Sequence, residues 1–509
     1  MEHIRDEDID ISLLQEIPLA FAKNNLLMPM KRAEGSLWAA VSDDQGILAL
    51  LDLAKRYGLN PLPLKTQQGV VIDAINRYYG QVGTAQEVME GITGEDLSSV
   101  AMEFESPKDL LELTEEAPII RLLNALLQQA VRENASDIHI EPYEREIDVR
   151  MRIDGILHKM LTPPKIIQDA LISRVKIMAN LDIAEKRLPQ DGRIRLLIGG
   201  KDIDIRVSII PTSHGERAVL RLLDRRQGLK GLQEVGLGER DERGFGELLN
   251  RTSGILLVTG PTGSGKTTTL YAVLNRIHRE EKNIITVEDP VEYQLKGIGQ
   301  IQVNPKIGLT FASGLRSILR QDPDVIMIGE IRDLETAEIA IQASLTGHLV
   351  LSTLHTNDAA SAITRLIDMG VEPFLIASSL VAVLAQRLVR VICPHCREKR
   401  ELSEAEHQYF LTSPSMSLCP HYIFGGRGCE RCRDSGYTGR TGLFELLYVD
   451  NEVRDLIISR MNAQSIKEYA LRQGMRTLFM DGLDKVMHGA TTLEEVLRVT
   501  QKDYAEGYV

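Results

Sequence analysis

One glycine-rich stretch constrains the fold of this chain more than any other part of it. It reads Gly260-Pro261-Thr262-Gly263-Ser264-Gly265-Lys266-Thr267 and fits the phosphate-binding pattern G-x-x-x-x-G-K-[ST]. The apolar run 255–259 before it predicts a buried parallel strand, and residues 267–279 after it, without Gly or Pro, predict a helix. Together they predict a nucleotide site, because glycines let backbone N–H groups surround phosphate oxygens and a helix N-terminus attracts negative charge.

Two side chains of this stretch have expected roles. Lys266 should reach the β- and γ-phosphates of ATP, and the Thr267 hydroxyl should hold Mg²⁺. Strands and helices alternate through residues 229–392, which predicts a parallel sheet flanked by helices, with its sites at the carboxyl ends of the strands. The longest apolar run, 374–385, is too short for a membrane span and predicts a buried helix.

The chain has 509 residues, more than one hydrophobic core supports, so several domains are expected. The expected fold class is α/β with a RecA-like P-loop ATPase core. The expected parts are a small α/β module at 1–80, an acidic linker at 81–116, an α+β sheet domain at 117–228, the RecA-like core at 229–392, a tetracysteine module at 393–436 and a helical segment at 437–509. In the first module we expect helices at 17–27 and 46–57 and a strand at 36–41.

Composition limits the function classes. The net charge of −13 argues against nonspecific nucleic-acid binding by the whole chain. The N-terminus is acidic and no apolar segment follows it, so we expect no signal peptide and a cytoplasmic location. The five cysteines are an odd number, and four of them form two C-x-x-C pairs, which is typical of a metal site and not of a disulfide framework.

The paired cysteines are Cys393, Cys396, Cys429 and Cys432. Four thiolates suit tetrahedral Zn²⁺, and a closed set of four leaves no open position for catalysis, so a structural role is expected. Residues 397–428 separate the pairs by more than a compact zinc ribbon allows, which predicts that they fold as an insert. We do not expect the nearby His395 or Cys419 to be ligands.

Carboxylates follow two apolar strands of the predicted core. Glu330 occupies the Walker B position, where a carboxylate can orient or deprotonate the attacking water. Gly329 replaces the Asp that usually binds Mg²⁺, so metal contact would come through water or from Glu288 and Asp289. These two and Glu292 surround a strand end, where three carboxylates are costly unless a cation or a water network uses them.

Two histidines, His348 and His355, bracket a third strand of the core. A lone histidine is more often structural. Two of them at the ends of one strand leave open a role in sensing the γ-phosphate or a neighbouring domain.

The strands of the sheet domain carry arginines: Arg150, Arg152, Arg206, Arg217 and Arg221. For most of them a solvated sheet face is the expected explanation. An ATPase that works as a ring uses arginines from elsewhere to stabilise phosphoryl charge, so one or two of the five are candidates for that role.

Together these motifs resemble those of the secretion-superfamily traffic ATPases, and most closely their type II secretion branch. The matching segments are the glycine-rich loop, an Asp box at 286–292, the Walker B segment at 320–333, a His box at 347–358, the segment 136–142 and the tetracysteine module. The resemblance covers about residues 117–500, and Gly329 follows this family's own pattern.

The resemblance implies an ATP hydrolase that works as a homohexamer, with ATP and Mg²⁺ at the cleft between the two larger domains. It implies Glu330 as the catalytic glutamate and Arg206 and Arg221 as inter-domain phosphate contacts. The other candidate catalytic residues are Lys266, Glu288, Glu292 and His355, and the candidate contacts between subunits are Arg316, Arg320 and Arg332. Residues 1–80 would dock on an inner-membrane platform protein, which implies peripheral association with that membrane.

The expected function is ATP hydrolysis that drives pseudopilus assembly and protein export. A type IV pilus extension ATPase is the alternative with the same chemistry, whereas the retraction ATPase lacks the tetracysteine module and the long N-terminal part. A nucleic-acid translocase conflicts with the acidic charge and with the lack of interleaved aromatic and basic residues. A nucleotide-switched scaffold without turnover conflicts with the presence of Glu330.

Overall fold

A computed structural model describes Ile4, Met89 and residues 8–17, 19–33, 35–79, 118–224, 230–278, 280–411 and 420–505. The chain divides into two compact units, Met1–Gln227 and Gly228–Val509. The expected linker at 81–116 lies outside the described residues apart from Met89, and so does Cys419. In the described part of the chain, no helix is both long and apolar enough to cross a membrane.

The N-terminal module is a three-stranded sheet with helices. Its elements are α1 (Ile11–Glu16), α2 (Leu19–Asn24), β1 (Leu27–Ala33), β2 (Ser36–Val41), α3 (Asp44–Tyr57), β3 (Asn60–Lys65) and α4 (Gln68–Tyr79). The strand expected at 36–41 and the helix expected at 46–57 are confirmed, whereas the helix expected at 17–27 is shorter than predicted and spans only Leu19–Asn24. Ile17 is extended and ends α1, because a residue before a proline avoids the helical conformation, and Leu27 already begins β1.

The free edge of this sheet is protected by prolines. The strand order is β1-β2-β3, which makes β3 an edge strand. The N–H groups of Asn60 and Thr66 donate to carbonyl oxygens of Gly35 and Val41, on the β2 side. Because backbone direction alternates along a strand, Pro61 and Pro63 occupy the outward positions, where their missing N–H groups remove the donors that another strand would use.

Residues 118–224 form an antiparallel sheet packed on helices, as the expected α+β domain requires. The strand order is β6-β5-β4-β9-β8-β7. The elements are α7 (Pro118–Arg132), β4 (Asp137–Pro142), β5 (Ile147–Ile153), β6 (Ile156–Leu161), η3 (Lys165–Ile167), α8 (Gln168–Met178), β7 (Gln190–Ile198), β8 (Lys201–Thr212) and β9 (Gly215–Asp224). Apolar residues of α7, α8 and one sheet face form a single buried core, which leaves the other sheet face for polar residues.

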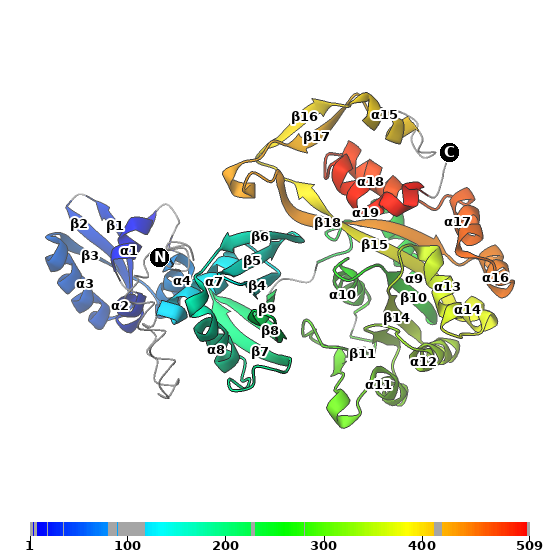
Figure 1. The fold of residues 1–509 in the computed structure, drawn as a ribbon, viewed down its shortest axis with the longest axis horizontal. Helices are drawn as coiled ribbons and strands as arrows, with labels where there is room; N and C mark the ends of the chain where they lie inside the picture. Colours follow the sequence, from blue (N-terminus) through cyan, green and yellow to red (C-terminus); the bar gives the residue numbers. More distant parts are fainter. Residues whose placement is uncertain are drawn as a thin grey trace. The chain divides into compact units, whose positions relative to one another are not determined.

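The second unit is built on a seven-stranded sheet, in the order β12-β11-β13-β14-β10-β15-β18. The strands of this sheet that Figure 1 labels are β11, β14, β10, β15 and β18. Its strands are β10 (Gly254–Thr259), β11 (Ile284–Glu288), β12 (Gly299–Gln302), β13 (Val325–Ile328), β14 (Leu349–Leu354), β15 (Leu380–Ile392) and β18 (Tyr437–Tyr448). The helices that accompany them are α9 (Glu239–Leu248), α10 (Lys266–Ile277), η4 (Pro305–Ile307), α11 (Phe311–Ile318), α12 (Leu334–Leu345), α13 (Ala359–Asp368) and α14 (Pro373–Ser379). Buried clusters that contain residues of alternate sheet faces confirm a parallel sheet covered on both sides.

Two segments of this sheet differ from the sequence expectation. The buried helix expected at 374–385 is only half correct, because α14 ends at Ser379 and the chain continues as β15, a strand parallel to β10. A strand buried on both faces is continuously apolar, so its pattern cannot be told from that of a buried helix. The segment from residue 437 begins with β18, which pairs antiparallel with β15, and not with a helix.

The tetracysteine region forms an arm beside the C-terminal helices. As expected, the residues between the cysteine pairs fold as an insert, with β16 (Arg397–Glu401), α15 (Glu404–Leu411) and β17 (Tyr422–Gly426), and η5 (Glu430–Cys432) contains the last cysteine. The helices α16 (Asn451–Ile458), α17 (Ala463–Arg472), α18 (Leu478–Met487) and α19 (Leu493–Ala505) follow. The hairpin β16–β17 lies beside α18 in Figure 1, and Arg397 donates to the His488 carbonyl oxygen there.

Candidate nucleotide site

The predicted phosphate loop lies between β10 and α10 and is shaped by its glycines. Gly263 and Gly265 have φ angles of +80° and +87°, which L side chains rarely adopt. At Gly260, a Cβ atom would lie 2.5 Å from the carbonyl oxygen of Gln386 on β15. The loop therefore needs these glycines both for its backbone conformation and for its close approach to a neighbouring strand.

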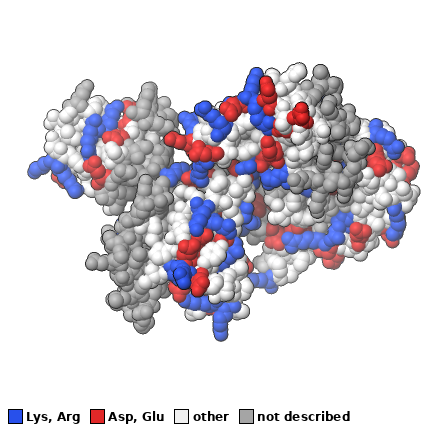
Figure 2. Space-filling view, turned by 45° about the horizontal axis from the view of Figure 1, so that its top comes forward, with Lys and Arg blue, Asp and Glu red and all other residues white. Residues whose placement is uncertain are grey.

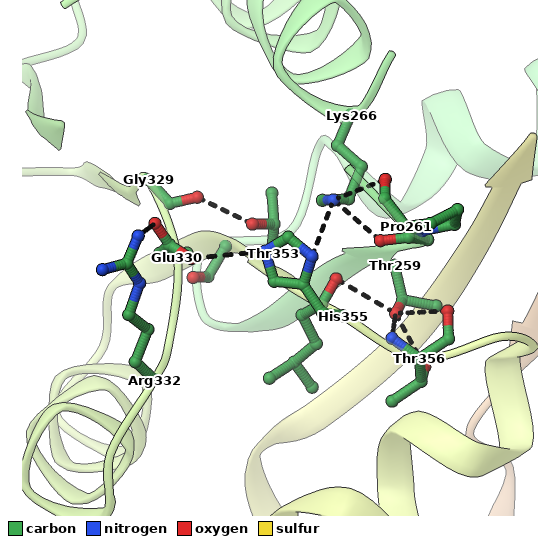
Figure 3. Close-up of polar contacts among 12 residues, drawn as sticks. Thr259, Pro261, Lys266, Gly329, Glu330, Arg332, Thr353, His355 and Thr356 are labelled. Atoms are coloured by element: carbon green, nitrogen blue, oxygen red, sulfur yellow. Dashed lines mark hydrogen bonds and ion pairs between the residues drawn. The ribbon is translucent and has the colours of Figure 1, made fainter. Parts of the chain in front are cut away.

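Lys266 begins α10, and its ammonium group turns back into this loop. Its Nζ donates to the carbonyl oxygens of Gly260 at 2.8 Å and Pro261 at 3.1 Å (Figure 3). The residue is 8% exposed, and burial lowers the pKa of Lys266 to about 8, although the charge of Glu330 opposes this shift. Carbonyl dipoles compensate a buried ammonium only in part, and a phosphate group at this place would complete the compensation.

His355 connects Lys266 to Glu330. Nζ of Lys266 lies 3.5 Å from Nδ1 of His355, and Nε2 of the same ring lies 3.3 Å from Oε2 of Glu330 (Figure 3). Because an ammonium group can only donate, Nδ1 acts as the acceptor in the contact with Lys266, and an N–H on Nε2 then points toward the carboxylate. Three predicted site residues thus form one polar chain at the carboxyl ends of β10, β13 and β14.

Glu330 is also bound by Arg332, whose Nη2 donates to Oε1 at 2.6 Å. Burial raises the pKa of Glu330, but the hydrogen bond and charge of Arg332 and the contact with His355 outweigh it, so the net pKa is lowered. The carboxylate is therefore ionised at neutral pH, which is the form that accepts a proton. Arg332, expected at a contact between subunits, binds Glu330 within this chain.

His348 has a different environment from His355. Its Nδ1 lies 2.8 Å from the carbonyl oxygen of Ala343 and 3.2 Å from Thr346 Oγ1, at the C-terminal end of α12. Of the two histidines that bracket β14, one terminates a helix and the other contacts the predicted phosphate site.

The Asp box forms a second polar network. Glu288 is 3% exposed and accepts hydrogen bonds from the Tyr271 hydroxyl at 2.5 Å, Thr286 Oγ1 at 2.6 Å and Gln300 Nε2 at 3.1 Å. Burial raises the pKa of Glu288, and these three neutral donors lower it only in part. The backbone N–H of Glu292 donates to the same Tyr271 hydroxyl at 3.3 Å. Glu288 and Glu292 therefore meet at Tyr271, a residue that the sequence motifs did not indicate.

Gln386 of β15 is a second residue that the sequence analysis missed. It is 1% exposed, and its Oε1 accepts from Thr269 Oγ1 of α10 at 2.7 Å. Its neighbour Arg387 donates to the carbonyl oxygen of Asn357 at 2.8 Å, and its positive charge adds to the lowering of the Lys266 pKa. A glutamine and an arginine within the apolar segment 380–392 were the available signal. It was overlooked because the apolar run was taken to end at residue 385 as a helix.

The arginines of the sheet domain line up with two buried acids. Asp137 pairs with Arg152 and Arg221, and Glu141 pairs with Arg150 and Arg217. Arg221 Nε donates to Asp137 Oδ1 at 3.0 Å. Arg206 lies directly opposite Arg221 in the β8–β9 register, so these two predicted phosphate contacts share one sheet face. Four of the five form cross-strand ion pairs, and their side chains stay partly exposed, with Arg221 at 57%, so the expected solvated face also carries ion pairs.

The four paired cysteines come together at the base of the arm. Their Sγ atoms all lie within 4.8 Å of one another, with separations of 3.9 Å for Cys393–Cys429, 3.8 Å for Cys396–Cys432 and 3.6 Å for Cys429–Cys432. Tetrahedral coordination with Zn–S bonds of about 2.3 Å requires sulfur separations of about 3.8 Å. The backbone N–H of Gly436 also points at Cys432 Sγ at 3.3 Å. The donor set therefore fits a structural zinc ion.

Comparison with known proteins agrees with this architecture. The family model described as type II/IV secretion system protein matches residues 112–498, and the MshEN domain model matches residues 1–85. The chain belongs to the type II/IV secretion system protein family. It is 50% identical over 495 residues to the type II secretion system protein E of Pseudomonas aeruginosa, covering 96% of this chain and 97% of that protein. This family member is an ATPase.

Two further similar proteins are pilus motors. The type IV pilus assembly ATPase PilB of Myxococcus xanthus is 43% identical over 502 residues, covering 98% of this chain and 89% of that protein. The crystal structure of the pilus retraction motor PilT with bound ADP superposes with a TM-score of 0.50 at 27% identity, covering 74% of this chain and 96% of that chain.

Proposed function

We propose that this secretion ATPase hydrolyses ATP to drive pseudopilus assembly and protein export across the outer membrane in type II secretion. The observation that carries the proposal is the polar chain Lys266–His355–Glu330 at the strand ends, in a sequence half identical to a type II secretion protein over nearly its whole length. The type IV pilus extension ATPase is the second candidate, because PilB is 43% identical.

Complementation separates the two machines. The chain is expressed in a bacterium that lacks its own type II secretion ATPase and, separately, in one that lacks its pilus extension ATPase. We expect export of type II substrates to return in the first strain and no pili in the second. Pili without restored export would transfer the function to the pilus machine.

Binding of ATP would first change the contacts of Lys266. We propose that the phosphates replace the carbonyl oxygens at Lys266, held by the loop of Gly260, Pro261, Thr262, Gly263, Ser264, Gly265 and Thr267. Glu330 then accepts the proton of the attacking water through a lone pair that Arg332 and His355 do not use, because each carboxylate oxygen can accept two hydrogen bonds. His355 is the residue best placed to signal phosphate occupancy to Glu330.

Mg²⁺ has suitable ligands at the same edge. Thr267 is exposed at the start of α10 and Asp289 is exposed in the Asp box, whereas both oxygens of Glu288 already accept hydrogen bonds. We propose that Thr267 and Asp289 hold the ion, directly or through water, and that Glu288 and Glu292 shape the Asp box behind it. When bound, Mg²⁺ neutralises charge on the β- and γ-phosphates.

The sheet domain would supply further positive charge. Arg206 and Arg221 are direct cross-strand neighbours. Arg221 pairs with Asp137, but its side chain is 57% exposed, so its guanidinium group can still reach a ligand. We propose that they contact phosphate and that a homohexameric ring fixes this approach. Specific activity should therefore fall as a dilution series passes from ring to monomer, and constant activity in monomeric fractions would contradict the ring.

The arm is proposed to hold one structural Zn²⁺ on Cys393, Cys396, Cys429 and Cys432. The sulfur separations of 3.6–3.9 Å are those a tetrahedral site requires. Metal analysis of protein purified without chelator should give about one zinc per chain. Folded protein without any metal would overturn this assignment.

We propose the partition of the chain that the sequence suggested, with residues 1–80 as a docking module, 81–116 as its tether, 117–228 and 229–392 as the working domains, 393–436 as the zinc arm and 437–509 as the C-terminal segment. The dock would be the cytoplasmic part of an inner-membrane platform protein, which keeps a cytoplasmic ATPase at the membrane. Pro61 and Pro63 leave the β3 edge poorly suited to strand addition, so the module would dock through side chains.

Deletion of residues 1–80 tests this anchor. Basal ATPase activity should stay near that of the full chain, the protein should leave the membrane fraction, and export should stop. A truncated protein that still sediments with membranes and supports export would show that the anchor lies elsewhere, with the zinc arm as the next region to delete.

A further inference from the structure

Tyr271 joins two parts of the nucleotide edge that the sheet itself keeps apart. The phosphate loop follows β10 and the Asp box follows β11, and the strand order β11-β13-β14-β10 places two strands between them. The backbone ladders therefore link β10 and β11 only through these two intermediate strands. A side chain that reaches from α10 to the end of β11 adds a direct connection between the phosphate loop and the Asp box.

The hydroxyl of Tyr271 makes several hydrogen bonds with the Asp box and the residue after it. Tyr271 lies in α10, which begins at Lys266, and is 2% exposed. Its hydroxyl donates to Glu288 Oε2 at 2.5 Å and lies 3.3 Å and 3.4 Å from the backbone nitrogens of Glu292 and Tyr293. One phenol thus holds both the strand end and the loop that follows it.

The other hydrogen-bond donors to Glu288 are also uncharged side chains. Thr286 Oγ1 donates to Glu288 Oε1 at 2.6 Å, and Gln300 Nε2 of β12 donates to the same oxygen at 3.1 Å. The Tyr293 ring also packs edge-on against the Tyr271 ring, with centroids 5.6 Å apart. A buried network in which every oxygen has a donor is rigid, and loss of one member leaves the others unsatisfied.

We propose that Tyr271 is a positioning residue that locks the Asp box to the phosphate-loop helix, so that the phosphates on Lys266 and the carboxylates of the Asp box keep one fixed separation. The inference rests on the proposed ATPase site, and it assigns Glu288 the part of a fixed acceptor through which Tyr271 acts. Without the Tyr271–Glu288 hydrogen bond, the Asp box can shift relative to the phosphate loop. Such a shift weakens binding of the metal–nucleotide complex and slows turnover, because a misplacement of reacting groups by about 1 Å costs up to 10²-fold in rate. It leaves the contacts of the phosphate loop with metal-free nucleotide intact.

The test compares Tyr271→Phe with Tyr437→Phe in the full-length chain. The control removes another phenol hydrogen bond, from Tyr437 to Thr492 Oγ1 at 2.9 Å, in the same unit but on β18. The affinity for a fluorescent ADP analogue is measured with EDTA and with Mg²⁺, together with kcat, KM and the thermal melt. For Tyr271→Phe we expect kcat to fall about tenfold or more and the Mg²⁺-dependent gain in affinity to be lost, with affinity in EDTA within twofold of wild type. The control should match wild type.

Two results would overturn the lock. The first is an unchanged kcat and an unchanged Mg²⁺ effect in Tyr271→Phe. The second is an equal loss of affinity in EDTA and in Mg²⁺ with a lowered melt, which would make Tyr271 a purely structural residue. The double variant with Glu288→Gln adds a check, because residues acting as a unit give a double variant no worse than the poorer single one, and additive losses would contradict the proposal.

Different measurements test the ATPase function and the positioning role of Tyr271. A wild-type protein that binds nucleotide but shows no turnover would overturn the proposed ATPase function. The EDTA and Mg²⁺ affinities would still decide the role of Tyr271, because they require no hydrolysis.

Discussion

The nucleotide edge of the second unit and the arginine-bearing sheet of the first carry dense charge in opposite ways. In the parallel sheet, β10, β13 and β14 are fully buried, and Lys266, Glu330 and His355 come only after the strands end. In the antiparallel sheet, charged residues lie along the strands and pair across them, as Asp137 does with Arg221. Charge at a strand end is available to a ligand, whereas charge within a strand is bound by its neighbours.

The reason is the number of covered faces. Helices cover both faces of the parallel sheet, so a charge in mid-strand would be buried without water. The antiparallel sheet buries one face on α7 and α8 and can place ion pairs on the other. On the surface seen in Figure 2, Lys and Arg side chains are likewise interspersed with Asp and Glu. Substitutions should therefore abolish activity at the strand ends. Along the strands they should mainly affect stability, except at the proposed phosphate contacts Arg206 and Arg221.

The largest effect is expected for Lys266→Ala. Loss of the ammonium at the phosphate loop should lower turnover by about 10³-fold, because no other group there neutralises the phosphates in the same place. The thermal melt should stay near wild type, since the buried charge carries a desolvation cost of its own. Lys306→Ala, at an exposed lysine of η4, is the control and should turn over normally. Wild-type turnover in Lys266→Ala would contradict the assignment of this loop as the catalytic phosphate site.

Glu330→Gln should lower turnover by about 10²-fold while nucleotide binding remains, because the amide keeps the shape and loses the base. Glu335→Gln is the matched control, an exposed acid on α12 that pairs with Arg316. Steady-state hydrolysis and equilibrium nucleotide binding separate the two properties. If Glu330→Gln were active and Glu292→Gln inactive, the catalytic base would belong to the Asp box.

The pH dependence follows from the two pKa shifts at the edge. The pKa of Lys266 is lowered to about 8, so the free enzyme loses this positive charge as pH rises, and kcat/KM should fall about tenfold per unit above pH 8. The pKa of Glu330 is lowered, so its proton-accepting form persists below the usual glutamate range and no acid limb should appear near neutral pH. Residual activity of Lys266→Arg should lack the alkaline limb, since guanidinium does not deprotonate. An alkaline limb that persists there would assign it to another group.

The smallest effect on turnover is expected for Glu141→Ala in the antiparallel sheet. The change leaves Arg150 and Arg217 without their shared buried carboxylate and should destabilise the first unit by about 2 kcal/mol. Turnover at a temperature below the melt should change less than threefold. Glu146→Ala, at an exposed acid of the same sheet, serves as the control for the denaturant midpoint. A turnover loss as large as that of Glu330→Gln would break the contrast between the two sheets.

Sequence periodicity alone was sufficient to predict those helices and strands whose structure depends on residues close together in the chain. The strand expected at 36–41 has the bounds of β2, the strand expected at 255–259 lies within β10, and the helix expected at 46–57 lies within α3. The glycines of the phosphate loop adopt the φ angles that the motif requires. Local hydrophobic period, caps and glycine conformation are properties of a few consecutive residues, so a pattern predicts them. The residue types at the strand ends also indicated Lys266, Glu330 and His355.

Only the tertiary structure decided which of these residues meet and what supports them. It made residues 380–392 a strand beside β10, separated the roles of His348 and His355, and bound Arg332 to Glu330. It also brought Gln386 and Tyr271 to the site from positions that carry no motif. These contacts join residues far apart in the chain, and they depend on strand order and on which faces are covered. The sequence determined the chemistry at each strand end, and the order of the strands in the sheet determined which ends lie together.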